Sequence, residues 1–67
     1  MDNEFGIWLK NMRRRNLLSQ LELANKAGIE RVTITLLETG KSNPSISTLN
    51  KLAKVFNLDP SELKKFL

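Results

Sequence analysis

Few side chains in this 67-residue sequence could do acid–base or nucleophilic chemistry. The sequence has no histidine and no cysteine, so the usual bases, thiol nucleophiles and zinc ligands are missing. Two of its acids, Glu22 and Glu62, each follow a potential helix cap by three residues, which gives them a structural role. No pair of carboxylates stands out as a catalytic pair. We therefore expect no enzymatic activity, no metal site and no cofactor.

The balance of charges favours an anionic partner. Lysine and arginine number 11 against 7 acids, which gives a net charge of +4 and a pI near 9.9. A basic protein attracts nucleic acid, although many small basic proteins bind none. The longest apolar run, residues 7–9, is far too short to span a membrane. We expect a soluble cytoplasmic protein that does not bind membranes.

Capping signals divide the chain into five short helices, which we expect to form one domain of residues 1–67. Asn3 could cap the first helix, which would end in the basic run at residues 13–15. Ser19 and Glu22 would form a capping box at the start of the second helix. Gly28 would end that helix in a left-handed conformation.

The fourth and fifth helices have equally clear signals. Ser45 would cap the fourth helix and Asn57 would end it, while residues 59–62 supply a cap, a first-turn proline and a capping-box glutamate. The apolar residues of the first helix expected to face inward are Phe5, Leu9 and Met12. Those of the fourth helix are Ile46, Leu49, Leu52, Ala53 and Phe56. Those of the fifth helix are Leu63, Phe66 and Leu67.

Residues 29–39 are ambiguous. Residues 32–36 alternate apolar and polar side chains, which is typical of a strand, and the four β-branched residues at their start together disfavour a helix by roughly 2 kcal/mol. A lone strand would leave its backbone unpaired, however. We therefore predict a third helix, stabilised by burial of Ile34 and Leu37 at roughly 1.5–3 kcal/mol each.

The second and third helices, at about residues 20–39, have the spacing of a helix-turn-helix. Ala24 is small where the two helices would cross, and Gly28 would turn the chain sharply. Ile29, Ile34 and Leu37 would face inward. The motif therefore predicts a compact all-α fold.

From residue 17 onward, the sequence LLSQLELANKAGIERVTITLLETGKSNPSISTLNKLAKVFNL resembles the phage-repressor, Cro-like (XRE-type) helix-turn-helix family. The elements Ser-Gln, Leu-Ala, Gly-Ile, Glu-x-Gly-Lys and Asn-Pro-Ser occur in the family's order, and the resemblance covers about residues 5–66. It implies a five-helix lambda-repressor-like domain that binds double-stranded operator DNA, commonly a palindrome, as a homodimer. The third helix would lie in the major groove, with the second above the backbone.

The resemblance assigns DNA contacts by position. Gln20 would bridge to phosphate and steady a base-reading side chain, and Arg31 could reach guanine O6 and N7, unless both are ordinary surface residues. Lys41 lies in the loop that would follow the DNA backbone. The expected DNA-binding residues are Gln20, Arg31, Val32, Thr33, Thr35, Leu36, Lys41, Ser42 and Asn43.

Two positions depart from the family pattern. Glu30 stands where a small polar cap is common, close to the expected phosphates, although a glutamate can accept from cytosine N4. Leu36 stands where a polar or basic reader is common, and it forms an apolar stripe with Val32. The stripe could read thymine methyl groups, bind a protein or be incidental.

Other matched positions imply structural roles. Arg13 and Glu38 match a pair that forms a partly buried salt bridge in the family. Arg14 and Arg15 could add attraction for DNA or simply end a solvated helix. The family's dimer surface commonly involves the fifth helix, so the candidate interface residues are Val55, Leu58, Leu63, Phe66 and Leu67, most of which could equally be core.

A different class of function remains open, namely a protein-interaction module on the same fold, antitoxin-like or anti-repressor-binding. The stripe of Val32 and Leu36 favours it, as does Trp8, which with Ile7 exceeds what the inward face of the first helix requires.

Overall fold

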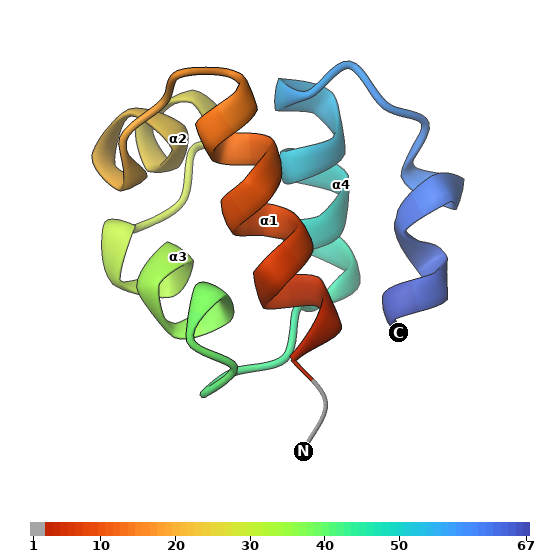
Figure 1. The fold of residues 1–67 in the computed structure, drawn as a ribbon. Helices are drawn as coiled ribbons and strands as arrows, with labels where there is room; N and C mark the ends of the chain where they lie inside the picture. The colour runs from red at the N-terminus through yellow and green to blue at the C-terminus, as the bar shows by residue number, and fades with distance from the viewer. Residues whose placement is uncertain (1–2) are drawn as a thin grey trace.

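The computed structural model describes residues 3–67, and every regular element within them is helical (Figure 1). Residues 3–67 form four α-helices and a final 3-10 helix: α1 (Glu4–Arg15), α2 (Gln20–Ala27), α3 (Arg31–Glu38), α4 (Ile46–Val55) and η1 (Pro60–Phe66). The predicted all-α fold class is confirmed. The segment with strand-like alternation is α3, as predicted.

Local sequence signals set several helix ends. The Ser19 hydroxyl accepts the backbone N–H of Glu22 at 3.0 Å, and the Glu22 carboxylate accepts the backbone N–H of Ser19 at 2.8 Å. Asp59 and Glu62 form the same reciprocal capping box at the start of η1. Ser45 caps α4 through its hydroxyl. These predicted caps are confirmed, because each depends only on residues close together in the sequence.

Asn3 differs from its predicted role. It occupies the N-cap position of α1, but its side chain makes no capping hydrogen bond there. Instead, its amide nitrogen donates to the backbone carbonyl of Glu38 at 3.2 Å, at the C-terminal end of α3. The end of a helix leaves carbonyl groups without partners, and Asn3 satisfies one of them. Asn3 thus ties the start of α1 to the end of α3.

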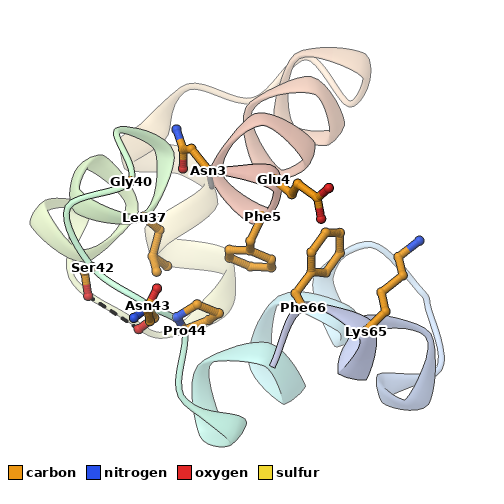
Figure 2. A pocket seen from close by; sticks show the side chains of 11 residues that line it. Asn3, Glu4, Phe5, Leu37, Gly40, Ser42, Asn43, Pro44, Lys65 and Phe66 are labelled. Atoms are coloured by element: carbon orange, nitrogen blue, oxygen red, sulfur yellow. Dashed lines mark hydrogen bonds between the residues drawn. The ribbon is translucent and has the colours of Figure 1, made fainter. Parts of the chain in front are cut away.

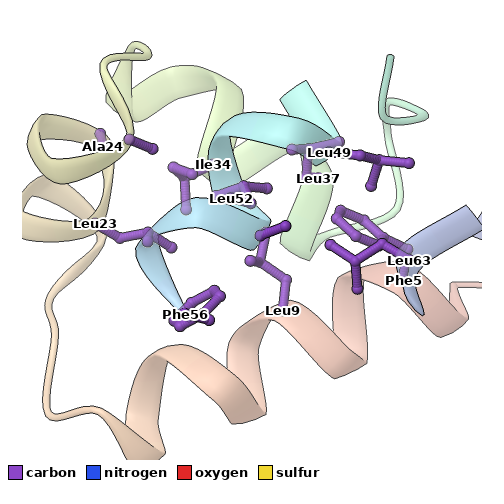
Figure 3. Packing of buried hydrophobic residues seen from close by; sticks show 12 residues of the cluster. Phe5, Leu9, Leu23, Ala24, Ile34, Leu37, Leu49, Leu52, Phe56 and Leu63 are labelled. Atoms are coloured by element: carbon purple, nitrogen blue, oxygen red, sulfur yellow. The ribbon is translucent and has the colours of Figure 1, made fainter. Parts of the chain in front are cut away.

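Every helix contributes to one hydrophobic core (Figure 3). Burying a leucine or isoleucine side chain stabilises a fold by about 1.5–3 kcal/mol. The two buried side chains of α3 can therefore offset its poor helix propensity. The fully buried large side chains are Leu9, Leu23, Ile34, Leu37, Leu52 and Leu63.

Two expected core residues lie outside the core. Ile46, predicted on the inward stripe of α4, is 64% exposed, because it begins the helix and the buried positions start one turn later at Leu49. Leu67, predicted inward in the fifth helix, is 62% exposed beyond the end of η1. Helical periodicity defines a face, but at a helix end no neighbouring element need cover it.

Trp8 is packed rather than free, which corrects its interpretation as surplus surface. Its ring lies 5.7 Å from that of Phe5, 6.0 Å from that of Phe56 and 5.6 Å from that of Phe66, between centroids. Such pairs add about 0.5–1.5 kcal/mol each beyond their buried area. This aromatic cluster holds α4 and η1 against α1. Ile7, the other surplus residue, is exposed.

Helices α1 and α3 approach each other closely at Gly6. A β-carbon there would overlap the backbone carbonyl oxygen of Leu37 and lie 2.9 Å from that of Glu38. Gly28 has a different requirement: its φ is +71°, but a β-carbon would meet nothing within 4 Å. The first glycine is needed for space and the second for its backbone conformation.

We expect Gly6→Ala to destabilise the fold by about 3 kcal/mol or more, because rigid backbone atoms must move to admit the methyl group. Gly28→Ala should cost only about 1 kcal/mol, the strain of a left-handed residue. Urea denaturation followed by circular dichroism would compare the two variants. An equal or smaller loss for Gly6→Ala would show that α1 and α3 are not held at this separation.

The capping box of α2 should make stability depend on pH. The backbone N–H of Ser19 lowers the pKa of Glu22, and the Ser19 hydroxyl and the charge of Lys26 act in the same direction. A carboxyl with a lowered folded-state pKa stabilises the fold above its ordinary pKa, about 4.3. That stabilisation is lost as the pH falls through the lowered value.

We therefore expect Glu22→Gln to be less stable than the parent at pH 7, with the difference vanishing once the pH lies below the lowered pKa of Glu22. Thermal melts at several pH values would measure the difference, and carbon-detected NMR would give the Glu22 pKa. A stability gap independent of pH, or a pKa above the ordinary value, would contradict this assignment.

Candidate nucleic-acid interface

The turn between α2 and α3 is built by backbone hydrogen bonds around a left-handed glycine. Gly28 donates to the carbonyl of Asn25 at 3.3 Å, and Ile29 donates to that of Ala24 at 3.0 Å. These bonds satisfy carbonyl groups that the end of α2 would otherwise leave without partners. Ala24 is buried, as expected for a small residue where two helices meet. The chain then enters α3 after the extended residue Glu30.

Four polar side chains, which we call the polar network, join α1, α2 and α3. Arg13 donates from Nε to Glu38 Oε2 at 2.7 Å and from Nη2 to Glu38 Oε1 at 3.1 Å. Gln20 donates from Nε2 to the same Oε1 at 3.1 Å and accepts the Thr35 hydroxyl at Oε1, at 3.0 Å. Because a carboxylate can only accept, the nitrogen of Gln20 must face Glu38 and its oxygen must face Thr35.

The ion pair in this network is buried and satisfied. The side chains of Arg13 and Glu38 are 12% and 3% exposed. The hydrogen bonds with Glu38 raise the pKa of Arg13, burial lowers it, and the charge of Glu38 raises it again. Among the residues that the structure describes, no buried side-chain nitrogen or oxygen lacks a partner. The expected salt bridge is therefore present and has a structural role.

The outer face of α3 is exposed to solvent. Arg31 is exposed, Val32 is 55% exposed and Leu36 is 37% exposed. Thr33 and Thr35 are half-buried beside them. The expected contact residues Arg31, Val32 and Leu36 are thus accessible on this helix, while the Thr35 hydroxyl is hydrogen-bonded to Gln20. The resemblance assigned Gln20 to steady a base-reading side chain, but nothing in the sequence identified Thr35 as the residue that it contacts.

The loop after α3 carries the remaining predicted contacts. Gly40 has a φ of +75° and lets the chain turn, and the backbone N–H of Lys41 donates to the carbonyl of Leu36 at 2.9 Å. Lys41, Ser42 and Asn43 are all exposed. The Ser42 hydroxyl donates to the carbonyl of Asn43 at 3.4 Å, and a dashed line marks this bond in Figure 2. The loop thus places one cation and two polar side chains just beyond the end of α3.

A small hollow lies beside this loop (Figure 2). Its volume is about 210 Å³, and its lining includes Phe5, Pro44 and Phe66. Within residues 3–67, no group of acidic side chains could hold a metal ion. No helix in that range has the length and apolar character to cross a membrane.

Four of the five candidate dimer residues lie in the core of this chain or pack against it. Leu63 is buried, so it is not available to a partner, and its assignment to an interface is corrected. Val55, Leu58 and Phe66 are half-buried against the core, which leaves Leu67 as the exposed member. Apolar residues at the end of a small chain are needed to complete its core before any can serve an interface.

The helical fold and the exposed outer face of α3 are typical of helix-turn-helix proteins, and comparison with known proteins identifies the family. A family model for helix-turn-helix proteins matches residues 9–63, and the chain belongs to this family. It is 45% identical over 49 residues to an HTH-type transcriptional regulator of Archaeoglobus fulgidus. The 49 aligned residues cover 73% of this chain and 69% of that protein.

Two further relatives support the same family. The chain is 34% identical over 61 residues to the ImmF control region 10 kDa protein of Bacillus phage phi105, which is 91% of this chain and 68% of the phage protein. It is 41% identical over 57 residues to the HTH-type transcriptional regulator PuuR of Escherichia coli, covering 85% of this chain but 31% of the regulator. The family is one of DNA-binding transcriptional regulators.

We expect Arg13→Ala to destabilise the fold by about 3–5 kcal/mol, because Glu38 would remain buried without its partner. Arg14→Ala, on an exposed neighbour, should change stability by less than about 0.5 kcal/mol. The double variant Arg13→Met/Glu38→Leu should recover most of the loss. Urea denaturation would measure the free energy of unfolding of each variant. A double variant no more stable than Arg13→Ala would contradict the structural role assigned to the ion pair.

Proposed function

We propose that the protein is a sequence-specific regulator of transcription that binds double-stranded DNA and acts as a dimeric repressor. Residues 1–67 would form the DNA-binding domain, with the helix-turn-helix at about residues 20–39. The observation that supports this proposal best is the way α3 is held. The polar network and the core fix its inner side, while its outer side stays exposed.

The dimensions of α3 suit the major groove. An α-helix with its side chains is about 10–12 Å in diameter, and the groove is about 12 Å wide. In the proposed complex Arg31 enters near the first turn and donates to guanine O6 and N7. The groove would then receive the outer face of α3, with α2 above the DNA backbone.

Phosphate contacts would come from both ends of the motif. Gln20 lies in the first turn of α2 and has one amide hydrogen that the polar network does not use. The start of a helix favours anions, so a phosphate there would meet both Gln20 and free backbone N–H groups. Lys41 and its exposed neighbours, Ser42 and Asn43, would contact the backbone beyond the other end of α3.

A protein-interaction module is the second candidate function, antitoxin-like or anti-repressor-binding. The exposed stripe of Val32 and Leu36 favours it. Trp8 does not, since its ring is packed against three phenylalanines. The proposal of DNA binding is the stronger one because cations, Arg31 and Lys41, flank the stripe on both sides.

Selection of duplexes from a random pool would identify the preferred DNA, and gel-shift titrations would compare variants on it. Arg31→Ala should cost about 1–3 kcal/mol and relax the preference at one base position. Lys41→Ala should weaken binding to all duplexes by a similar factor. It should also reduce the slope of log affinity against log salt concentration by about 1. Lys64→Ala, on η1, is the matched control and should change nothing. The absence of any enriched or bound duplex at low salt would overturn the proposal.

The same selection tests dimerisation. A dimeric repressor should enrich a palindrome whose half-sites lie about 34 Å apart, one turn of the double helix. Sedimentation equilibrium, with and without that duplex, would give the number of chains bound. A single, asymmetric half-site occupied by one chain would show a monomeric DNA-binding protein instead.

A further inference from the structure

The outer face of α3 has fewer free hydrogen-bond donors than its sequence suggests. The Thr35 hydroxyl donates to Gln20 Oε1 at 3.0 Å, with the carbonyl of Arg31 as a second acceptor at 3.3 Å. The Thr39 hydroxyl, just beyond the helix, donates to the carbonyl of Thr35 at 2.8 Å, with that of Leu36 at 3.3 Å. A hydroxyl has one proton, so both threonines use theirs within the protein.

Val32 and Leu36 form an apolar ridge on the outer face of α3, between Arg31 and Lys41. Val32 and Leu36 are 55% and 37% exposed, and residues four apart in an α-helix have neighbouring side chains. No element in residues 3–67 buries either of them. The ridge lies on the side of α3 opposite Ile34 and Leu37, which are buried in the core.

The chemistry of α3 limits which base edges it could recognise. Arg31 can donate to guanine, and the carboxylate of Glu30, which makes no capping bond, can accept from cytosine N4. Adenine is usually recognised by asparagine or glutamine, and α3 has neither. An A·T pair beneath the ridge would instead present the C5-methyl group of thymine, which apolar side chains contact.

We propose that Val32 and Leu36 determine specificity by recognising thymine methyl groups. This inference rests on the DNA-binding function proposed above. The preferred half-site would contain A·T pairs with their methyl groups against the ridge, beside a G·C pair contacted by Arg31. A duplex is favoured over a protein as occupant because exposed cations, Arg31 and Lys41, lie at the two ends of the ridge and match the charge of its phosphates.

The test uses the duplex selected from the random pool, with each thymine replaced in turn by deoxyuridine. This change removes the methyl group and keeps every hydrogen-bonding group of the base. At one or two positions in each half-site, we expect affinity to fall about fourfold, the effect of one buried methyl group. Cytosine placed at such a position should bind more weakly than 5-methylcytosine.

Protein variants assign the effect to the ridge. For Val32→Ala and for Leu36→Ala, the affinities for the thymine and deoxyuridine duplexes should become nearly equal at a single position of the half-site. Ile46→Ala is the matched control, since it shortens an exposed apolar side chain on α4, and this variant should keep the full ratio of affinities. Circular dichroism would confirm that each variant keeps its helices.

The outcomes separate this inference from the proposed function. Equal affinity for thymine and deoxyuridine duplexes at every position would overturn the methyl contacts and leave DNA binding intact. Failure to select any duplex would overturn both proposals. If Leu36→Asp abolished binding of a protein partner but left DNA affinity unchanged, the ridge would be a protein-binding surface and the inference would be wrong.

Discussion

The buried ion pair between Arg13 and Glu38 is the interaction on which the arrangement of the three N-terminal helices depends. Removing two charges from water is unfavourable, and the pair is tolerated because the two groups are hydrogen-bonded to each other and no buried side-chain nitrogen or oxygen in the described residues lacks a partner. That requirement fixes the position of α1 relative to the end of α3. Gln20 joins α2 to this ion pair, because its amide nitrogen donates to the same oxygen of Glu38 that accepts from Arg13. A small set of directional bonds thus joins α1, α2 and α3, in addition to the packing of the core.

The stability of α3 comes from its inner side, and this frees its outer side for recognition. Its β-branched sequence is a poor helix former, and the burial of Ile34 and Leu37 compensates for it. Gly6 lets α1 come close enough to cover that inner side, and Asn3 satisfies a carbonyl at the end of α3. Residues such as Arg31, Val32 and Leu36 contribute little to this packing. Their identities can therefore follow the requirements of a ligand.

The predictions that differ from the structure involve neighbours that local patterns do not describe. Trp8 looked like surplus because α1 alone already had an inward face, yet α4 and η1 together create a second place for an aromatic ring. Ile46 continued the apolar period of α4, but the core does not reach the first turn of that helix. Asn3 had the right type and position to accept a capping hydrogen bond, but its amide nitrogen instead donates to the carbonyl of Glu38 at the end of another helix.

The sequence by itself determined the helical fold class, the caps at Ser19, Ser45 and Asp59, and the left-handed turn at Gly28. These features depend on interactions between residues a few positions apart, where residue type and spacing suffice. Only the tertiary structure decided that Thr35 is bound to Gln20 and that the apolar ridge of α3 stays uncovered. Hydrogen bonds across 15 residues and solvent exposure depend on which helices become neighbours in space. Helical periodicity assigns faces, but only packing determines what each face meets.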